Sequence, residues 1–264
     1  MTDWFDCEKL QITTGRNTLY LLDEVSSTND FLLGKINNTK ATVCRFINHR
    51  WHCSEQIVDA ADIQKNSVVI AKTQTKGRGR MGRTWFDGGL QMSWDISDEI
   101  KSGFSVWIGV ICATAIRKST DKNVMLKWPN DLYLDDKKMA GILVDRVCSS
   151  VERKLVAGVG INLGTSLPAE IDATTLSEVN LEMLVGNIIN EHDTNLHSFA
   201  NDGWQTWNEK FRELDYLFGR QITVQGKSPG IAAGIANSGA LIITMPDGST
   251  VESFASETHI TEIK

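Results

Sequence analysis

Apolar positions along the chain follow two patterns, one typical of strands and one typical of buried helices. The segment 67–73 (SVVIAKT) is apolar and β-branched, and apolar residues alternate with polar ones over 89–96, so each segment predicts a strand. Residues 103–119 are almost continuously apolar, which predicts a buried helix. Residues 27–37 predict a shorter, half-apolar helix that begins at a capping serine or threonine.

The rest of the chain predicts more strands, then helices, then strands again. Strands are expected at 123–128, 131–134, 140–147 and 154–163, with a turn at 135–138 and three glycines near the end of the last strand. Residues 176–216 are mostly helical in pattern. Short β segments follow from Arg220, with turns at 237–239 and 246–248. This order indicates an α/β fold.

The change of pattern near residue 218 is the best candidate for a domain boundary. Long helices give way there to four or five short strands within about 45 residues, and a domain this small must form a little barrel or lean on its neighbour. We therefore expect a larger domain over 1–217 and a smaller one over 218–264.

The segment 77–85 (GRGRMGRTW) carries the most chemistry. It has three glycines and three arginines in seven residues, followed by a tryptophan. Arginines hold fixed positive charge, and glycines let backbone N–H groups approach a ligand closely. Such a loop suits a ligand with a phosphate and a flat ring.

Two familiar phosphate-binding motifs nearly fit this loop, and we reject both. The glycines match G-x-G-x-x-G, and 77–84 comes within one residue of a P-loop, but both motifs require a helix directly after the loop. The residues after this loop predict a strand.

Composition limits the classes of function. A chain of 264 residues that is 41% hydrophobic can bury a large core, and its net charge of −6 disfavours a general nucleic-acid surface. No run of about 20 apolar residues indicates a membrane span, and residues 1–9 are too acidic for a targeting peptide. Five scattered cysteines give an odd number without a disulfide framework, which favours a reducing compartment, most simply the cytosol.

Two further motifs occur with the loop. They are SSTND at 26–30, and KWPND at 127–131 followed by KKMAGI at 137–142. Together with Gln74, they have the order and spacing seen in biotin–protein ligases, and the chain resembles that family (biotin–[acetyl-CoA-carboxylase] ligases and holocarboxylase synthetases). The resemblance covers about residues 20–165 well and the C-terminal part more loosely.

The resemblance implies a mixed β-sheet backed by helices, related to class II aminoacyl-tRNA synthetase-like folds, followed by a small SH3-like barrel. Only about 25 residues precede Ser26, so we expect the form without an N-terminal DNA-binding domain, with ligase activity and no nucleic-acid partner. The implied reaction activates biotin with ATP and Mg²⁺ as biotinyl-5′-AMP. It then transfers biotin to a lysine of the biotin carboxyl carrier domain of a biotin-dependent carboxylase. The protein is expected to be a monomer or homodimer without a membrane partner.

The resemblance also implies roles for particular residues. Lys127, Asp131 and Arg80 are the expected catalytic residues, with Lys127 and the arginines stabilising phosphoryl charge and Asp131 meeting the acceptor amine. The expected biotin-binding residues are Ser27, Thr28, Asn29, Gln74, Arg78, Gly79, Arg80, Lys138 and Gly141. The expected nucleotide-binding residues are Arg78, Trp85, Lys127, Asn130 and Asn162. No metal ligand is assigned with certainty, although Asn130 or Asp131 is the candidate to reach Mg²⁺ carried by ATP.

The segment 40–66 is longer than the connection usual in compact family members. Its Cys44, His49, His52 and Cys53 are potential zinc ligands, but their spacing matches no standard finger, and an ordinary surface insertion is favoured. Its aromatic residues also suit packing on a partner or over a site entrance.

Three other functions stay open at this point. A lipoate–protein ligase would share the fold but should show an arginine-arginine and triple-glycine loop, which is absent. An inactive binding module should have lost a charged residue such as Arg78, Lys127 or Asp131. A dinucleotide-binding oxidoreductase is disfavoured by the strand predicted after the loop.

Overall fold

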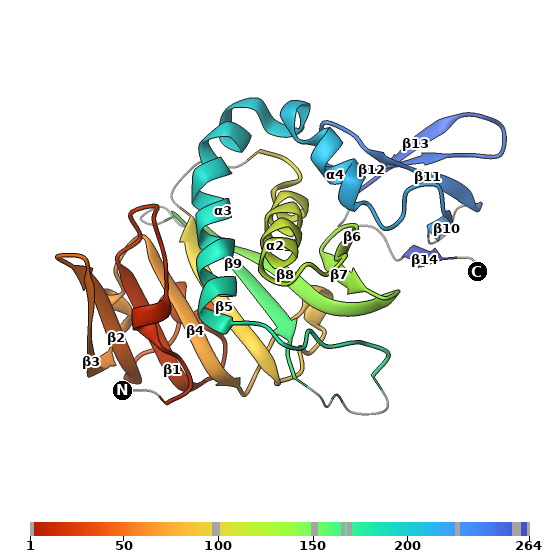
Figure 1. Cartoon of the computed structure of the whole chain (residues 1–264). Helices are drawn as coiled ribbons and strands as arrows, with labels where there is room; N and C mark the ends of the chain where they lie inside the picture. The colour runs from red at the N-terminus through yellow and green to blue at the C-terminus, as the bar shows by residue number, and fades with distance from the viewer. Residues whose placement is uncertain are drawn as a thin grey trace.

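The computed structural model describes residues 3–96, 101–148, 153–164, 167, 171–224, 228–254 and 260–262. Its strands form a nine-stranded mixed sheet and a five-stranded antiparallel sheet. Figure 1 shows helices packed on the large sheet and the small sheet at the C-terminal end of the molecule. The expected fold class, a mixed sheet backed by helices with a small all-β unit after it, is confirmed.

The large sheet runs in the order β3-β2-β1-β4-β5-β9-β8-β7-β6. Strands β1 and β4 pair in parallel, and the other neighbours pair antiparallel. The strands are β1 (Thr18–Val25), β2 (Thr39–Ile47), β3 (Arg50–Val58), β4 (Ser67–Gln74), β5 (Gly89–Ile96), β6 (Met125–Lys127), β7 (Asp131–Leu134), β8 (Lys137–Cys148) and β9 (Arg153–Asn162).

Alternation along the central strands divides the core into two layers. Leu19 and Leu21 belong to the larger core cluster, whereas Tyr20 and Leu22 belong to a smaller one, as expected when successive side chains point to opposite faces. Helices α2 (Phe104–Thr120) and α3 (Leu181–Asp202) pack together over the larger cluster (Figure 1), and the short α1 (Thr28–Leu32) contributes Phe31 and Leu32 to the smaller. Helix α4 (Asn208–Leu214) follows α3.

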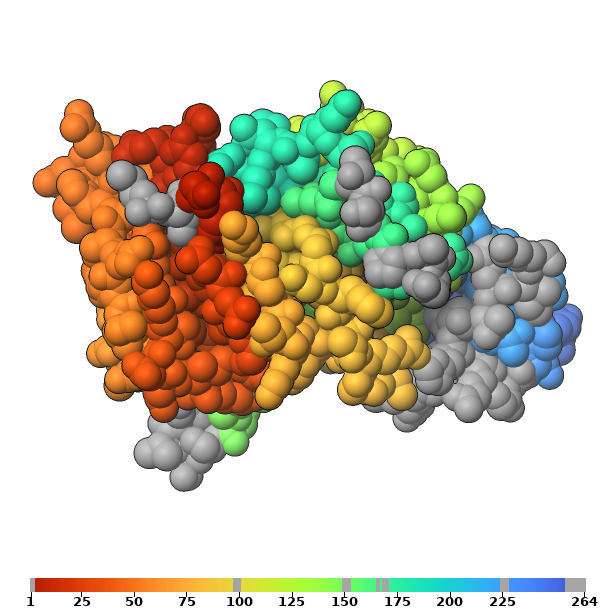
Figure 2. Space-filling model, turned by 90° about the horizontal axis from the view of Figure 1, so that it is seen from below, coloured from red at the N-terminus to blue at the C-terminus, as the bar shows by residue number. Residues whose placement is uncertain are grey.

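One expectation from the sequence is wrong in detail. The helix expected over 27–37 ends at Leu32, because Gly34 adopts a left-handed φ of 71° soon after it. The segment 40–66, expected to be a surface insertion, contains most of the hairpin of β2 and β3, which extends the edge of the sheet. Its two-residue turn is Asn48-His49, and both residues have positive φ, as in the hairpin turns that usually use glycine. Figure 2 shows this hairpin, in orange, at one end of the molecule.

The small sheet runs in the order β13-β12-β11-β10-β14. Its strands are β10 (Gln221–Val224), β11 (Gly230–Ile235), β12 (Leu241–Thr244), β13 (Thr250–Ser253) and β14 (Ile260–Glu262). The predicted turns are confirmed at Gly239 and Gly248, both with positive φ. Trp128 Nε1 donates a hydrogen bond to the carbonyl of Gly239 at 3.0 Å, which joins this sheet to the end of β6. The division into domains 1–217 and 218–264 stays a prediction.

A buried polar network joins the start of β1 to α3 and β5. Arg16, 7% exposed, donates to Asp193 at 2.8 Å and to Asp95 at 3.1 Å. Burial raises the pKa of Asp193, but hydrogen bonds from His192 and Arg16 outweigh it and lower that pKa to about 2. The ion pairs therefore anchor the N-terminal segment against α3. Among the described residues, no helix has the length and apolar character needed to cross a membrane.

Candidate active site

A cavity of about 330 Å³ lies between the glycine-arginine loop and strands β6 to β9. It brings together every predicted site residue except Asn162, although these residues are scattered over more than 100 positions of the chain. The predicted residues that line it are Ser27, Thr28, Asn29, Gln74, Arg78, Gly79, Arg80, Trp85, Lys127, Asn130, Asp131, Lys138 and Gly141.

The glycine-arginine loop is folded as a small hairpin. Trp85 N–H donates to the carbonyl of Gly77 at 2.9 Å, and Gly79 N–H donates to the carbonyl of Arg83 at 2.7 Å. A short 3-10 turn (Arg80–Gly82) forms its tip. Strand β5 follows the loop, as predicted, so the dinucleotide and P-loop motifs are correctly rejected.

The Trp85 ring lies on a floor of glycines. Gly141 on β8 and Gly160 on β9 are directly paired, and a Cβ added to Gly160 would lie 2.4 Å from the ring. A Cβ on Gly141 would lie 3.0 Å from it. Both values are tighter than ordinary van der Waals contact, so the bare backbone at these two positions lets the indole reach the sheet.

Arg78 is held by two carboxylates. Its Nη2 lies 2.9 Å from Asp30 Oδ1 in α1 and 2.9 Å from Asp145 Oδ2 in β8. Asn29 Nδ2 also donates to Asp145 Oδ2 at 3.0 Å. The side chain of Arg78 is 39% exposed, so the pair is screened by water and serves mainly to set the direction of the guanidinium.

Lys127 lies among aromatic rings. Its Nζ donates to Tyr133 Oη at 3.2 Å, and it lies 4.7 Å from the centre of the Tyr133 ring and 5.5 Å from that of Tyr216. The ring faces stabilise the ammonium without neutralising its charge. Lys127 therefore presents a whole positive charge to the cavity.

The KWPND motif also supplies two polar side chains to the cavity lining, and both pair with side chains from other parts of the lining. Asp131 Oδ1 lies 2.7 Å from Lys138 Nζ, and the same ammonium lies 5.6 Å from the centre of the Trp85 ring. Arg80 Nη1 donates to Asn130 Oδ1 at 3.2 Å, and Asn130 Nδ2 donates to the carbonyl of Ile142 at 2.8 Å. Burial lowers the pKa of Arg80, and Asp131 partly offsets that effect. An arginine still carries its full charge at neutral pH.

A buried hydroxyl supports the residues of the SSTND motif. Ser93 Oγ lies 2.6 Å from Asn29 Oδ1 and 2.7 Å from Thr28 Oγ1, and Ser93 is fully buried on β5. Gln74 Oε1 accepts hydrogen bonds from Thr28 N at 2.8 Å and Thr28 Oγ1 at 3.1 Å. Ser27 caps α1. These contacts fix one wall of the cavity before any ligand arrives.

Asn162 is the one predicted site residue that lies outside the cavity lining. Its Nδ2 donates to the carbonyl of Thr174 at 3.1 Å, so the amide holds the chain after β9. Sequence reasoning also missed Tyr133, Gly158 and Gly160, which do line the cavity. The sequence contains a feature that could have indicated each of them. Tyr133 lies two residues from Asp131 on the same strand face, and the two glycines lie in the glycine-rich end of β9.

The charges in the cavity favour an anion. Arg78, Arg80, Arg83, Lys127 and Lys138 all line it, and Asp131 is the acidic residue in its lining. The Trp85 indole provides a flat surface beside these positive charges. Such a site suits a ligand that combines phosphate groups, a planar ring and a carboxylate.

The fold and part of the sequence resemble those of the biotin and lipoate ligases. The sequence pattern of the biotin/lipoate A/B protein ligase family matches residues 44–162. A biotin protein ligase from Aquifex aeolicus, solved in complex with biotin and ATP, has the same fold: the TM-score is 0.73 at 24% identity, covering 93% of this chain and 99% of that one.

Two relatives that are similar in sequence are both named as biotin ligases. The bifunctional ligase/repressor BirA of Escherichia coli is 29% identical over 232 residues, covering 80% of this chain and 71% of its own. The biotin–[acetyl-CoA-carboxylase] ligase of Paracoccus denitrificans is 27% identical over 229 residues, covering 75% of this chain and 92% of its own. In sequence and in fold the chain is therefore similar to biotin protein ligases.

We predict that Gly160→Ala lowers the free energy of unfolding by about 1–3 kcal/mol, because the new methyl group overlaps the Trp85 ring. In a Trp85→Ala background the same change should have a much smaller effect. Urea unfolding of the four proteins in this double-mutant cycle measures the coupling. An equal loss of stability in both backgrounds would show that the ring does not rest on Gly160.

Proposed function

We propose that this protein catalyses ATP-dependent biotinylation of a specific lysine on a biotin carboxyl carrier domain, through biotinyl-5′-AMP. The observation that supports this most strongly is that the glycine-arginine loop and the KWPND motif line the same cavity. A carboxylate and an amine do not join at neutral pH without activation, and adenylation supplies the activated acyl group. The family and the names of its relatives support biotin as the acid and an acetyl-CoA carboxylase as the source of the acceptor.

In the first step the biotin carboxylate attacks the α-phosphate of ATP and pyrophosphate leaves. Negative charge increases on the phosphoryl oxygens as the new bond forms. Lys127, with its whole charge held against Tyr133 and Tyr216, and Arg80, held by Asn130, stabilise that charge. Lys138 holds the biotin carboxylate beside the Trp85 ring.

Mg²⁺ is part of the proposal. It binds oxygen ligands and keeps several waters, so the carboxylate of Asp131 and the amide oxygen of Asn130, both in the cavity lining, fit it. When bound with ATP, the ion neutralises phosphate charge.

In the second step a lysine amine of the carrier domain attacks the acyl carbon of biotinyl-5′-AMP and AMP leaves. The attacking amine must be neutral, and a carboxylate within reach orients it and takes up its proton. We assign this role to Asp131, because it pairs at 2.7 Å with Lys138, the residue proposed to hold the biotin carboxylate.

We propose that the biotin ring is recognised by Thr28, Asn29 and Gln74, together with Ser27. These residues form the cavity wall that the buried Ser93 hydroxyl supports. Buried hydroxyl and amide groups satisfy the donors and acceptor of a ureido ring. The Trp85 ring and the hairpin loop are proposed to cover the adenylate and keep water from it. The cytosol stays the proposed compartment, because the proposed reaction consumes ATP.

Incubation with ATP, biotin and an isolated biotin carboxyl carrier domain should add one biotinyl group to that domain, as measured by intact-protein mass spectrometry. A carrier whose target lysine is replaced by arginine, and a reaction without ATP, serve as controls. Transfer of lipoate but not biotin, or equal labelling of the arginine variant, would contradict the proposed function.

Lys127→Met should slow adenylate formation by about 10²–10³-fold while biotin affinity changes far less. Methionine keeps most of the side-chain volume between Tyr133 and Tyr216, so the fold should persist. The lost ammonium stabilises charge that develops only in the transition state. Single-turnover adenylation and biotin calorimetry measure the two quantities.

Lys122→Met, at an exposed position outside the cavity, is the matched control. The assignment of Lys127 is wrong if biotin affinity collapses and the adenylation rate at saturating biotin stays normal. Lys127 would then be a biotin-binding residue.

A further inference from the structure

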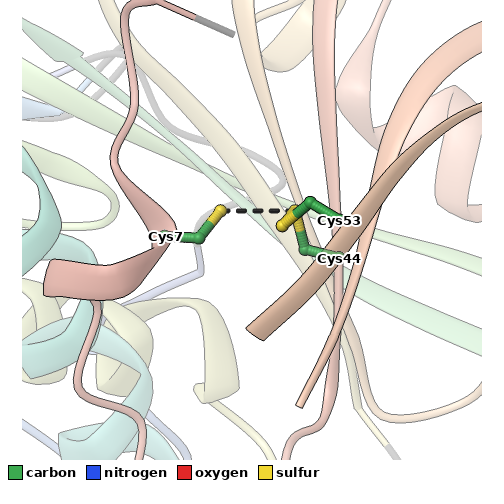
Figure 3. Close-up of side chains that lie close together, drawn as sticks. All are labelled: Cys7, Cys44 and Cys53. Atoms are coloured by element: carbon green, nitrogen blue, oxygen red, sulfur yellow. Dashed lines mark hydrogen bonds between the residues drawn. A yellow bond between two sulfur atoms is a disulfide. The ribbon is translucent and has the colours of Figure 1, made fainter. Parts of the chain in front are cut away.

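Three cysteine sulfurs meet at the edge of the large sheet, away from the residues that line the cavity. Cys44 on β2 and Cys53 on β3 are opposite each other in the hairpin register and form a disulfide. Cys7, in the 3-10 turn Cys7–Lys9 near the N-terminus, places its Sγ 3.3 Å from Cys44 Sγ (Figure 3). All three sulfurs lie within 4.8 Å of one another.

This arrangement corrects the expectation that the cysteines form no disulfide. The cysteines do form a disulfide, because an unpredicted hairpin places Cys44 and Cys53 side by side. The four zinc candidates of that segment are not brought together: among the residues that the structure describes, the group of potential ligands joins the two cysteines with Cys7 and includes neither histidine. His52 follows the alternation of β3 and so points to the face opposite Cys53.

The N-terminal segment is held against the hairpin by contacts other than sulfur. Trp51 Nε1 donates to the carbonyl of Leu10 at 3.4 Å, and Asp6 N–H donates to Glu182 of α3 at 2.9 Å. Phe5, Cys7 and Trp51 belong to the same core cluster. The contact between Cys7 and the disulfide is therefore fixed by packing on both sides.

The sulfurs differ in access to solvent. Cys44 is fully buried and Cys7 is 9% exposed, whereas Cys53 is only partly buried. Cys53 is therefore the most exposed of the three cysteines. The thiol that touches the disulfide is the one that solvent reaches poorly.

We propose that Cys7, Cys44 and Cys53 form a thiol–disulfide exchange site that transfers the free thiol from Cys7 to Cys53. The Cys7 thiol loses its proton to solvent, its side chain turns until the sulfur is in line with the Cys44–Cys53 bond, and the sulfur bonds to Cys44 Sγ. The Cys44–Cys53 bond breaks, and its electron pair leaves on Cys53 Sγ, which takes a proton from solvent. One disulfide and one thiol exist before and after, so the step needs no oxidant.

The exchange has two consequences. A disulfide between Cys7 and Cys44 ties the N-terminal segment covalently to β2, the strand next to the edge of the large sheet. The freed Cys53 thiol becomes available to small disulfides in solution, such as oxidised glutathione. Its sulfur attacks one sulfur of the reagent, forms a mixed disulfide, and releases the other half as a thiol.

The surroundings of Cys7 set the rate of the exchange. Burial, together with the charges of Asp6, Glu8 and, from α3, Glu182, raises the pKa of the Cys7 thiol to about 11. The groups that face it from β2 and β3 are the two cysteine sulfurs and Trp51. Because the thiolate is the attacking form, exchange should be slow at neutral pH. As long as the pH is below 11, each increase of one pH unit should raise the rate about tenfold.

The test follows the unreduced full-length protein with iodoacetamide present at pH 7 and pH 9. Non-reducing peptide mapping by mass spectrometry then locates the label and the disulfide. The expected result is a Cys7–Cys44 disulfide with label on Cys53, appearing about 100-fold faster at pH 9 in proportion to the Cys7 thiolate. The exposed Cys148 thiol should label throughout as an internal control.

Two variants separate the exchange from direct reaction at Cys53. Cys7→Ser should keep the Cys44–Cys53 disulfide and leave Cys53 unlabelled. Cys53→Ser, treated with oxidised glutathione, should form the Cys7–Cys44 disulfide. Label on Cys7 with the Cys44–Cys53 disulfide intact, or three free thiols with a stoichiometric bound metal such as zinc in the untreated protein, would overturn the proposal.

Discussion

Repulsion among cationic side chains in one cavity is the constraint on which the rest of the site depends. Three arginines and two lysines line the same cavity in a chain whose net charge is −6. Nearby groups moderate that repulsion: Asp30 and Asp145 hold Arg78, Asp131 holds Lys138, and tyrosine rings hold Lys127. The positive charge that remains stabilises a phosphate ester, and most strongly one whose charge is increasing.

The backbone makes this concentration of charge possible. A strand rather than a helix follows the glycine-arginine loop, so the loop offers an anion side chains and a hairpin turn and not a helix terminus. Paired glycines on β8 and β9 remove the side chains that would otherwise hold the indole off the sheet. Ser93 orients the polar wall from within the core. The cavity therefore has one rigid wall and one wall built from a loop.

Much of the fold was predictable because its signals are local. The alternation over 89–96 and the apolar run over 103–119 correspond to β5 and α2 almost residue for residue. The hairpin of β2 and β3 was not predictable, because its turn uses Asn48-His49 in place of glycine and its polar outer face hides the strand period. The three motifs indicated which residues meet in the cavity. Asn162 lies outside the lining and its amide donates to the carbonyl of Thr174, so its role in nucleotide binding stays a prediction. The contact of Cys7 with Cys44 depends on packing between distant segments, which no spacing in the sequence expresses.

The central claim is that this cavity adenylates biotin. Pyrophosphate release measured with ATP and biotin, against ATP and lipoate and against ATP alone, tests it most directly, without the carrier domain. The account predicts a burst of pyrophosphate, close to one per protein molecule, that appears with biotin and is absent with lipoate or with ATP alone. A burst with lipoate and none with biotin, or no burst with either acid, would contradict the account.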